Sequence, residues 1–385
     1  MDLRYGNNPH QSFARAEPVD PANVPVKVVN GAPSMINLLD ALNAWQLVRE
    51  LRTALDMPAA TSFKHVSPAG AAVAEPLSED LVRTYEVGGK ELSPLATAYV
   101  RARGADPKSS FGDFVAVSDP LDVETAKVLK FAVSDGLIAP GFEEGAFDIV
   151  AGKKGGKYLV LEADPDFTPP EHETRELFGM KLTQDHNARP ITGADIANPV
   201  VGELDDAARR DLILGLITLK FTQSNSVAYS LGGQMIGIGA GQQSRVDCTK
   251  LAGAKADTWH LRRHPKILDL PFAKGVKKQE RINWRVRIIE GDLTSSELDA
   301  IAASMDGDWA PLTADERADW MKQLTGVAMV SDGFIPFRDN IDHASMHGVS
   351  SIAQPGGSIR DDDIQAACRD YGISLVHTGV RLFHH

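Results

Sequence analysis

The segment AATSFKHVSPAG (59–70) indicates the fold class, because an apolar strand pattern leads directly into a chain reversal that carries ionisable side chains. Residues 59–66 predict a strand and residues 67–70 predict the turn that follows it. Lys64 and His65 stand at the carboxyl end of the strand, where α/β proteins usually bind ligands. Neighbouring strand residues point to opposite faces, so both side chains reach one pocket only if the strand ends or bulges there. The alternative is a buried histidine beside an exposed lysine.

Strand and helix patterns alternate on both sides of this segment. Residues 24–30 (VPVKVVN) predict a strand, and Asn37 is the predicted N-cap of the helix that follows. That helix has an apolar stripe at helical spacing, formed by Leu38, Leu42, Trp45 and Leu51. Residues 211–221 (DLILGLITLKF) are apolar on nearly all sides of a helix, which predicts a buried helix.

The rest of the chain continues the alternation. Further strands are predicted at residues 113–119, 233–239, 327–332 and 373–378. Helices are predicted to begin at the capping boxes Thr294–Glu297 and Thr313–Glu316 and near residues 361–363. Alternation of this kind favours an α/β fold with mixed sheets. Residues 163–175 (ADPDFTPPEHETR) form the most linker-like stretch.

Charge and composition exclude several classes of function. The chain has 40 basic and 52 acidic residues and a net charge of −12, which argues against nucleic acid or an anionic membrane surface as the main partner. No run of about 18 apolar residues is present, so no transmembrane helix is predicted. The polar N-terminus lacks the apolar core of a signal peptide. Two cysteines far apart in the sequence, Cys248 and Cys368, favour a reducing cytoplasm.

Three further groups of residues are candidate sites. Residues 237–245 (GIGAGQQSR) follow a strand but match no dinucleotide or P-loop pattern, so their glycines indicate close approach to a flat ligand. Residues 4–11 (RYGNNPHQ) are either a polar binding segment or a frayed end. His343 and His347 have the i, i+4 spacing of a metal clamp, but no third ligand is evident, which favours a solvated helix face. We therefore predict no metal site.

Nine segments, in this order, resemble the transformylase domain of the bifunctional purine-biosynthesis enzyme 5-aminoimidazole-4-carboxamide ribonucleotide (AICAR) formyltransferase/IMP cyclohydrolase. They are RYGNNPHQ (4–11), VVNGAPSMINLLDALNAWQLV (28–48), SFKHVSPAGAA (62–72), ARGADPKSSFGDF (102–114), VSDGLIAPGFEE (133–144), FTQSNSVAYS (221–230), IGIGAGQQSR (236–245), SDGFIPFRDN (331–340) and RLFHH (381–385). The family's cyclohydrolase domain has no counterpart here, so the resemblance implies the transformylase part alone.

The resemblance implies a fold of two cytidine-deaminase-like α/β subdomains with mixed sheets and without zinc. We expect the first subdomain at residues 1–170 and the second at residues 171–385, with residues 263–325 able to pack against the first. It also implies a homodimer whose active sites lie between subunits. Members of the family can hold a monovalent cation, for which this sequence identifies no ligands.

The implied reaction transfers a formyl group from 10-formyltetrahydrofolate to the 5-amino group of AICAR, giving formyl-AICAR and tetrahydrofolate. This amine is a poor nucleophile and loses a proton as it attacks, while negative charge develops on the formyl oxygen. The imidazole of His65 is suited to accept that proton. The cation of Lys64 is suited to stabilise the oxyanion. The alternative is a catalytically degenerate ribotide- or folate-binding protein, which loss of the Lys–His pair would have favoured.

The resemblance also assigns the remaining site residues. Asn225 joins Lys64 and His65 as a catalytic residue that orients the formyl group. The predicted AICAR contacts are Arg4, Tyr5, Asn37, Gly112, Asp135, Arg245, Phe334 and Arg381. The predicted folate contacts are Val246, Asp339, Ser358, Ile359 and Asn283, the last in a stretch (279–292) that differs from the family.

Overall fold

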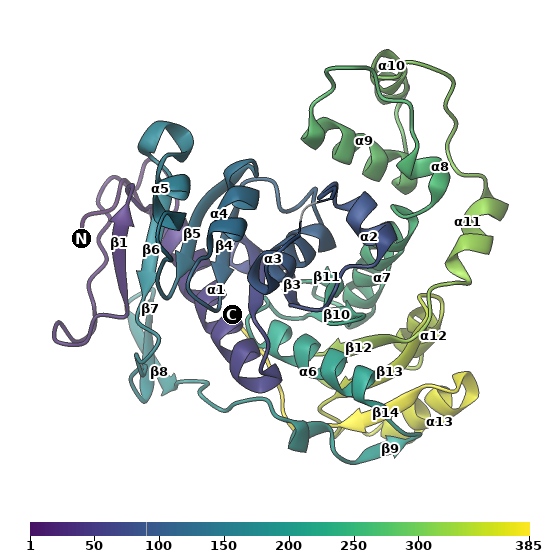
Figure 1. The fold of residues 1–385 in the computed structure, drawn as a ribbon. Helices are drawn as coiled ribbons and strands as arrows, with labels where there is room; N and C mark the ends of the chain where they lie inside the picture. Colours follow the sequence, from purple (N-terminus) through teal and green to yellow (C-terminus); the bar gives the residue numbers. More distant parts are fainter. Residues whose placement is uncertain (90) are drawn as a thin grey trace.

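The computed structural model describes residues 1–89 and 91–385 as two six-stranded mixed sheets and a separate hairpin (Figure 1). The first sheet contains, in spatial order, β1 (Val26–Asn30), β6 (Leu159–Ala163), β5 (Ser134–Ala139), β4 (Asp113–Val117), β2 (Ala59–Lys64) and β3 (Ser67–Val73). The second contains β11 (Met235–Gly239), β10 (Val227–Ser230), β12 (Val327–Ser331), β13 (Val349–Gln354), β14 (Ser374–His377) and β9 (Pro199–Val201). The hairpin pairs β7 (His172–Leu177) with β8 (Met180–Asp185). The predicted α/β class with mixed sheets is confirmed.

The two sheets have the same strand directions. Starting from β3 in one sheet and β11 in the other, two antiparallel pairings are followed by two parallel pairings and a final antiparallel one. Parallel neighbours require crossover connections, which short helices provide in both halves. The chain therefore builds the same α/β unit twice.

Two long helices occupy the centre of the molecule (Figure 1). α1 (Met35–Leu55) and α6 (Asp206–Lys220) follow the first strand of their units, pack against each other and contribute to one shared apolar core. In α6 every residue from Asp211 to Lys220 is buried, which confirms the buried helix predicted from its apolar surface.

Further helices cover the remaining faces of the two sheets. The first sheet is covered by α3 (Pro94–Ala105), α4 (Val123–Lys130) and α5 (Ala146–Ala151), with α2 (Glu79–Thr84) and the 3₁₀ turn η1 (Lys153–Gly156) nearby. The second is covered by α7 (Arg245–Leu261), α12 (Asp339–Ser345) and α13 (Asp361–Tyr371), and η2 (Gly193–Ile196) precedes β9. A separate small core involves the helical segment α8 (Pro265–Leu268), α9 (Lys278–Glu290), α10 (Ser295–Ala303) and α11 (Ala314–Met321).

The start of α1 differs from the prediction. Ser34, and not Asn37, is the N-cap, and the helix begins at Met35. The Asn37 amide N–H donates to the Ser34 side chain, and the Asn37 side-chain oxygen accepts from the Ser34 backbone N–H at 3.1 Å. Asn37 is thus the return partner of a capping box, a role that a short polar side chain three residues after the cap can fill. The capping boxes at Thr294–Glu297 and Thr313–Glu316 are confirmed.

Two stretches predicted as irregular belong partly to strands. Residues 67–70, which were predicted as a turn, form the start of β3. The chain reverses immediately before them, at His65 and Val66. Pro68 is tolerated because β3 is the edge strand of its sheet. The linker-like stretch 163–175 ends inside β7, which begins at His172.

The helical segment contacts the first half of the chain through a charged cluster. Arg281 and Arg285 of α9 pair with the two carboxylate oxygens of Glu86 at 2.8 and 2.7 Å. The domain boundaries expected from the sequence, at residues 170 and 263–325, stay predictions. Within residues 1–89 and 91–385, no helix combines the length and the apolar character that crossing a bilayer would need.

Candidate active site

The Lys64–His65 pair stands at a strained β-hairpin tip. β2 ends at Lys64, which pairs with Ser67, so His65 and Val66 alone form the reversal. Their φ angles are 53° and 60°, in the left-handed region that histidine and valine rarely adopt. Because the strand has ended, both Lys64 and His65 line one cavity of about 480 Å³.

This cavity joins the two units of the chain. The Gly-rich stretch singled out from the sequence borders it through Ala240 and Gly241. The backbone N–H of Gln223 donates to the Ser67 hydroxyl at 3.2 Å, which links the start of β3 to the second unit. Lys108 and Lys255, which the sequence did not single out, also line the cavity, and they are paired with Glu290 and Asp106 at 3.1 and 3.0 Å. The cavity therefore suits a strongly polar ligand.

The Lys64 side chain is positioned by the loop before β4. Its ammonium donates to the carbonyl of Phe111. A Cβ atom at Gly112 would lie 3.3 Å from Lys64 Nζ and 3.9 Å from a carboxylate oxygen of Asp135, so these three residues come together as predicted neighbours. Gly112 has a φ of 74°, a second reason for glycine here. Asp135 also pairs with Lys154 at 2.8 Å.

A buried acid on α1 supports the hairpin tip from behind. Asp40 is 6% exposed, and its carboxylate accepts the backbone N–H of Val66 at 2.7 Å. Burial raises the pKa of Asp40 to about 6, an effect partly opposed by that hydrogen bond and by the charge of His65. The sequence analysis did not single out Asp40, because one acid within an otherwise apolar helical stripe is not distinctive.

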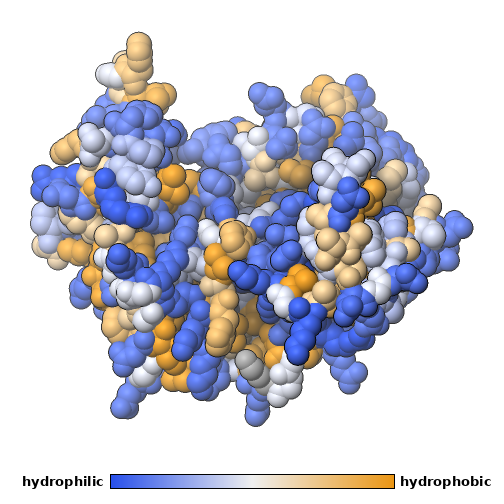
Figure 2. Space-filling model, turned by 90° about the horizontal axis from the view of Figure 1, so that it is seen from above, coloured by the Kyte–Doolittle hydropathy of each residue, from blue (hydrophilic) through white to orange (hydrophobic). Residues whose placement is uncertain are grey.

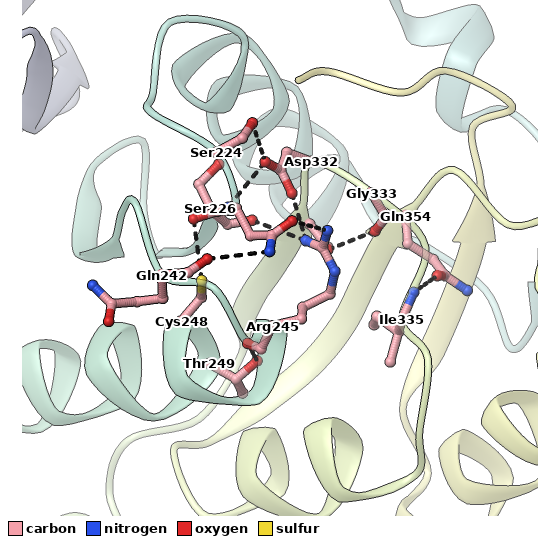
Figure 3. Close-up of polar contacts among 12 residues, drawn as sticks. Ser224, Ser226, Gln242, Arg245, Cys248, Thr249, Asp332, Gly333, Ile335 and Gln354 are labelled. Carbon is pink, nitrogen blue, oxygen red and sulfur yellow. Dashed lines mark hydrogen bonds and ion pairs between the residues drawn. The ribbon is translucent and has the colours of Figure 1, made fainter. Parts of the chain in front are cut away.

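A second polar cluster centres on Arg245, the first residue of α7 (Figure 3). Its guanidinium pairs with Asp332 at 2.5 Å and donates to the Asn225 side-chain oxygen at 2.9 Å. Asp332 is fully buried and also accepts from the Ser224 hydroxyl and the Ser226 backbone N–H. Each buried charge thus has several partners, as a low-dielectric interior requires.

Asn225 uses both of its side-chain donors within this cluster. Its side-chain amide donates to the carbonyls of Gln242 and Gln243 at 3.1 and 3.2 Å, while its oxygen accepts from Arg245. The peptide bond between Ser224 and Asn225 is cis. A ligand that accepts a hydrogen bond from Asn225 must therefore replace one of these carbonyls.

The Arg245 cluster lies beside a second cavity of about 530 Å³. Six of the predicted site residues line it: Asn225, Arg245, Val246, Phe334, Asp339 and Arg381. Phe334 is 48% exposed, so its ring is available for stacking on a flat ligand rather than packed into the core. Asp332, which the sequence analysis did not name as a site residue, supports this cavity through its ion pair with Arg245; its signal in the sequence was its place within the family segment 331–340.

The other predicted site residues do not line either cavity, although Gly112 and Asp135 lie beside Lys64. Among the residues that the structure describes, those lining the two cavities do not include Arg4, Tyr5, Asn37, Asp135, Gly112, Ser358, Ile359 or Asn283. Arg4 lies over the ring of Tyr5, with its guanidinium carbon 5.9 Å from the ring centroid. Ile359 is fully exposed just before α13, and Asn283 accepts from Gln279 within α9. Their predicted roles stay predictions.

His343 and His347 form neither a metal clamp nor a solvated helix face. α12 ends at Ser345, so His347 lies beyond the helix that the spacing required. His347 is held by Asp257 at 2.7 Å and packs edge-on against Tyr229, with ring centroids 5.9 Å apart. Across residues 1–89 and 91–385, no cluster of three or more His, Cys, Asp or Glu side chains is arranged to hold a metal ion.

Comparison with known proteins places the chain in a family. Residues 1–255 match the family described as AICARFT/IMPCHase bienzyme. The chain belongs to this family. Over its whole length it is 31% identical to the bifunctional purine biosynthesis protein PurH of Cereibacter sphaeroides, 29% to that of Magnetococcus marinus and 30% to that of Xanthomonas campestris pv. campestris. It spans 59%, 59% and 58% of these proteins, respectively.

Membership of the AICARFT/IMPCHase family confirms the resemblance inferred from the nine segments. The family match reaches residue 255, so it includes both the Lys64–His65 tip and Arg245. The PurH proteins extend the similarity to the C-terminal stretch that carries Phe334 and Arg381.

Proposed function

We propose that this chain is a folate-dependent formyltransferase of purine biosynthesis, which transfers the formyl group of 10-formyltetrahydrofolate to the 5-amino group of AICAR. The observation that carries the proposal is the placement of Lys64 and His65 together in one polar cavity of a chain that belongs to the AICARFT/IMPCHase family. Both groups that the reaction needs, a base and a cation, come from adjacent residues.

The proposed chemistry is a direct acyl transfer. The AICAR amine attacks the formyl carbon, His65 accepts the amine proton, and the bond between that carbon and the folate nitrogen breaks as His65 passes the proton to that nitrogen. A positioned general base contributes about 10²–10⁴-fold. The Lys64 ammonium stabilises the charge on the formyl oxygen, a contact of the kind whose loss costs roughly 3–4 kcal/mol. Because the Phe111 carbonyl already holds this ammonium, the Lys64 side chain loses little further conformational freedom when the transition state forms.

The Arg245 cavity is the proposed binding site for the ribotide and the folate. Arg245 and Arg381 line it, and arginine matches the planar, bidentate geometry of phosphate and carboxylate oxygens. Arg245 is already tied to Asp332, so its remaining donor capacity is limited and Arg381 is the freer phosphate ligand. Phe334 supplies a ring face for the imidazole or the pterin.

We further propose a cytoplasmic homodimer with shared active sites. Both the Lys64 cavity and the Arg245 cavity border the loops at residues 223–225 and 240–243, and both are open to a second copy of the chain. Exposed apolar side chains on the β7–β8 hairpin, such as Phe178 and Met180, are consistent with an interface. Apolar patches also interrupt the hydrophilic face shown in Figure 2. Both cysteine thiols are free and buried, in keeping with a reducing compartment.

The test is a spectroscopic assay of tetrahydrofolate formation from 10-formyltetrahydrofolate with this chain and AICAR, with formyl-AICAR identified by chromatography. The Lys64→Ala/His65→Ala double variant is the control for adventitious transfer. We expect turnover that depends on AICAR and is lost in the double variant. Absence of product together with tight AICAR or folate binding would instead support the degenerate binding protein.

A further inference from the structure

The two α/β units carry equivalent β-hairpins. In each unit a long central helix leads to a strand that pairs with the next one, β2 with β3 and β10 with β11, and each pair has a bulge at the same distance from the tip. In the first hairpin the two tip residues are His65 and Val66. In the second they are Gly232 and Gly233, between Leu231 and Gln234, whose backbones are hydrogen-bonded. All four tip residues have positive φ angles, from 53° to 75°.

An aspartate in the same place holds each tip. Asp211 is the sixth residue of α6, and its two carboxylate oxygens accept the N–H groups of Gly232 and Gly233, each at 2.7 Å. Asp40 is the sixth residue of α1, and its carboxylate accepts the Val66 N–H at 2.7 Å. The same device, a helix-borne carboxylate bonded to a hairpin tip, thus occurs in both units.

The two hairpin tips differ in backbone strain. Glycine adopts positive φ freely, so the Gly232–Gly233 tip is relaxed. An L-residue in this region costs roughly 1–2 kcal/mol, and a β-branched residue such as Val66 is an outlier there. Strain of this kind persists only where the surroundings hold it, and it gathers at functional sites. In the first unit the strain falls on the tip that presents Lys64 and His65.

We propose that Asp40 is a positioning residue for the Lys64–His65 pair, because its carboxylate holds the strained tip in the one conformation that turns both side chains toward the cavity. The role in catalysis rests on the proposed function; the hold on the tip does not. Asp40 itself does not line the cavity among the described residues, so it acts through the Val66 backbone.

The surroundings of Asp40 make this hold sensitive to pH. The charged groups that act on it are His65 and Lys64 at the hairpin and Asp135 at the start of β5. With burial raising its pKa to about 6, Asp40 is ionised at neutral pH and neutral in mild acid. An ionised acceptor makes the stronger bond to an N–H, so the tip is held more firmly above pH 6 than below it.

The first experiment compares Asp40→Ala, Asp40→Asn and the matched control Asp211→Asn. Because a displacement of about 1 Å can cost 10²-fold in rate, we expect Asp40→Ala to lower kcat at least ~10-fold at pH 7.5 with little change in the KM for AICAR. Asp40→Asn retains an oxygen acceptor and should recover part of the loss. Asp211→Asn weakens the equivalent bonds in the other unit and should leave kcat per folded molecule within ~2-fold. Equal losses in kcat for Asp40→Ala and Asp211→Asn would overturn the proposal.

The second experiment measures the NMR signal of the hairpin tip and needs no assay of turnover. His65–Val66 is the only His-Val dipeptide in the sequence, so carbonyl-¹³C histidine with ¹⁵N valine selects the Val66 amide alone in an HNCO spectrum. Its shift should titrate with a midpoint near pH 6. The titration should persist in His65→Gln, labelled with carbonyl-¹³C glutamine, and disappear in Asp40→Asn. A titration that survives in Asp40→Asn would overturn the hold on the tip. An inactive wild-type chain with a normal Val66 titration would refute the proposed reaction and leave the hold standing.

Discussion

At the scale of single residues, the candidate site depends on charged side chains that are positioned by specific hydrogen bonds and ion pairs. Lys64 is tied to the Phe111 carbonyl, and Arg245 is tied to the fully buried Asp332. Asp40 is buried and accepts the backbone N–H of Val66, and its burial raises the pKa of the carboxyl to about 6. The two cavities therefore differ: one is built on a strained backbone, the other on a buried ion pair.

Removing either member of the Lys64–His65 pair should slow the chemical step. We expect His65→Ala and Lys64→Ala each to lower kcat by at least about 10²-fold, because each removes help that is realised mainly in the transition state. AICAR affinity, measured by calorimetry, should change much less. Near-normal turnover of His65→Ala would place the base on another residue.

The ionisation of Asp40 should be visible in stability. Its pKa rises from an ordinary 3.8 to about 6 on folding, so the folded state binds the proton more tightly than the unfolded state does. The free energy of unfolding should then fall as pH rises from 4 to 6, by up to about 3 kcal/mol. Asp40→Asn lacks the titrating carboxyl group, so its stability relative to the wild type should increase between pH 4 and pH 7.5. Urea unfolding at several pH values measures the difference; a constant difference would contradict the raised pKa.

At the scale of secondary-structure elements, the two hairpins form an internal comparison. β2–β3 and β10–β11 share their bulge, their tip length and their aspartate, but only one tip consists of glycines. Gly70 and Gly237, which follow the two tips, would each place a Cβ 2.1 Å from a helix carbonyl, Ala102 in α3 and Ala252 in α7. Close strand–helix approach is thus a shared property of the units, while the strained tip is particular to the first.

Exchanging the tip residues should have opposite effects on stability. Val66→Gly removes the strain of an L-residue at positive φ, which costs roughly 1–2 kcal/mol. Glycine, however, loses more conformational entropy on folding, which costs about 1 kcal/mol. We therefore expect the substitution to be near neutral or stabilising. Gly233→Val introduces that strain and places its Cβ 2.7 Å from Glu75 Cγ, so it should destabilise by more than about 2 kcal/mol. Chemical denaturation gives both values. If Val66→Gly proved as damaging as Gly233→Val, the first tip would not be strained.

At the scale of the whole molecule, the chain is one α/β unit built twice and joined through α1 and α6. The doubling places the Lys64 cavity at the β2–β3 hairpin and the Arg245 cavity at the start of α7 in the other unit. The shared active site of a homodimer stays a proposal at this scale.

Mixed dimers should recover activity if the sites are shared. One inactive variant lacks Lys64 and His65, and the other lacks Arg245 or Asn225. If the two defects fall on different chains of one site, random mixing makes about half of the dimers mixed and restores about a quarter of the sites. Co-refolding followed by the formyl-transfer assay measures this fraction. Failure of every pair, together with an active monomer in sedimentation, would exclude a shared site.

The sequence by itself determined what depends on neighbours along the chain. Apolar runs predicted β4, β11, β12 and β14, and the capping boxes at Thr294 and Thr313 were correct because a cap and its partner are three residues apart. The buried α6 was evident because a helix that is apolar on all sides has no face for solvent. The family was evident from long motifs, which need no knowledge of packing.

Only the tertiary structure decided how distant residues combine. Asp40 reaches Val66 across 26 positions, and Arg245 reaches Asp332 across 87. No local pattern encodes such pairs, because burial and sheet pairing bring them together after the elements have formed. The tip was also misplaced at residues 67–70, since Ser-Pro-Ala-Gly favours a turn locally but the edge of a sheet accommodates Pro68 and moves the reversal to His65 and Val66. The position of that reversal sets the direction of the two residues on which the proposed chemistry depends.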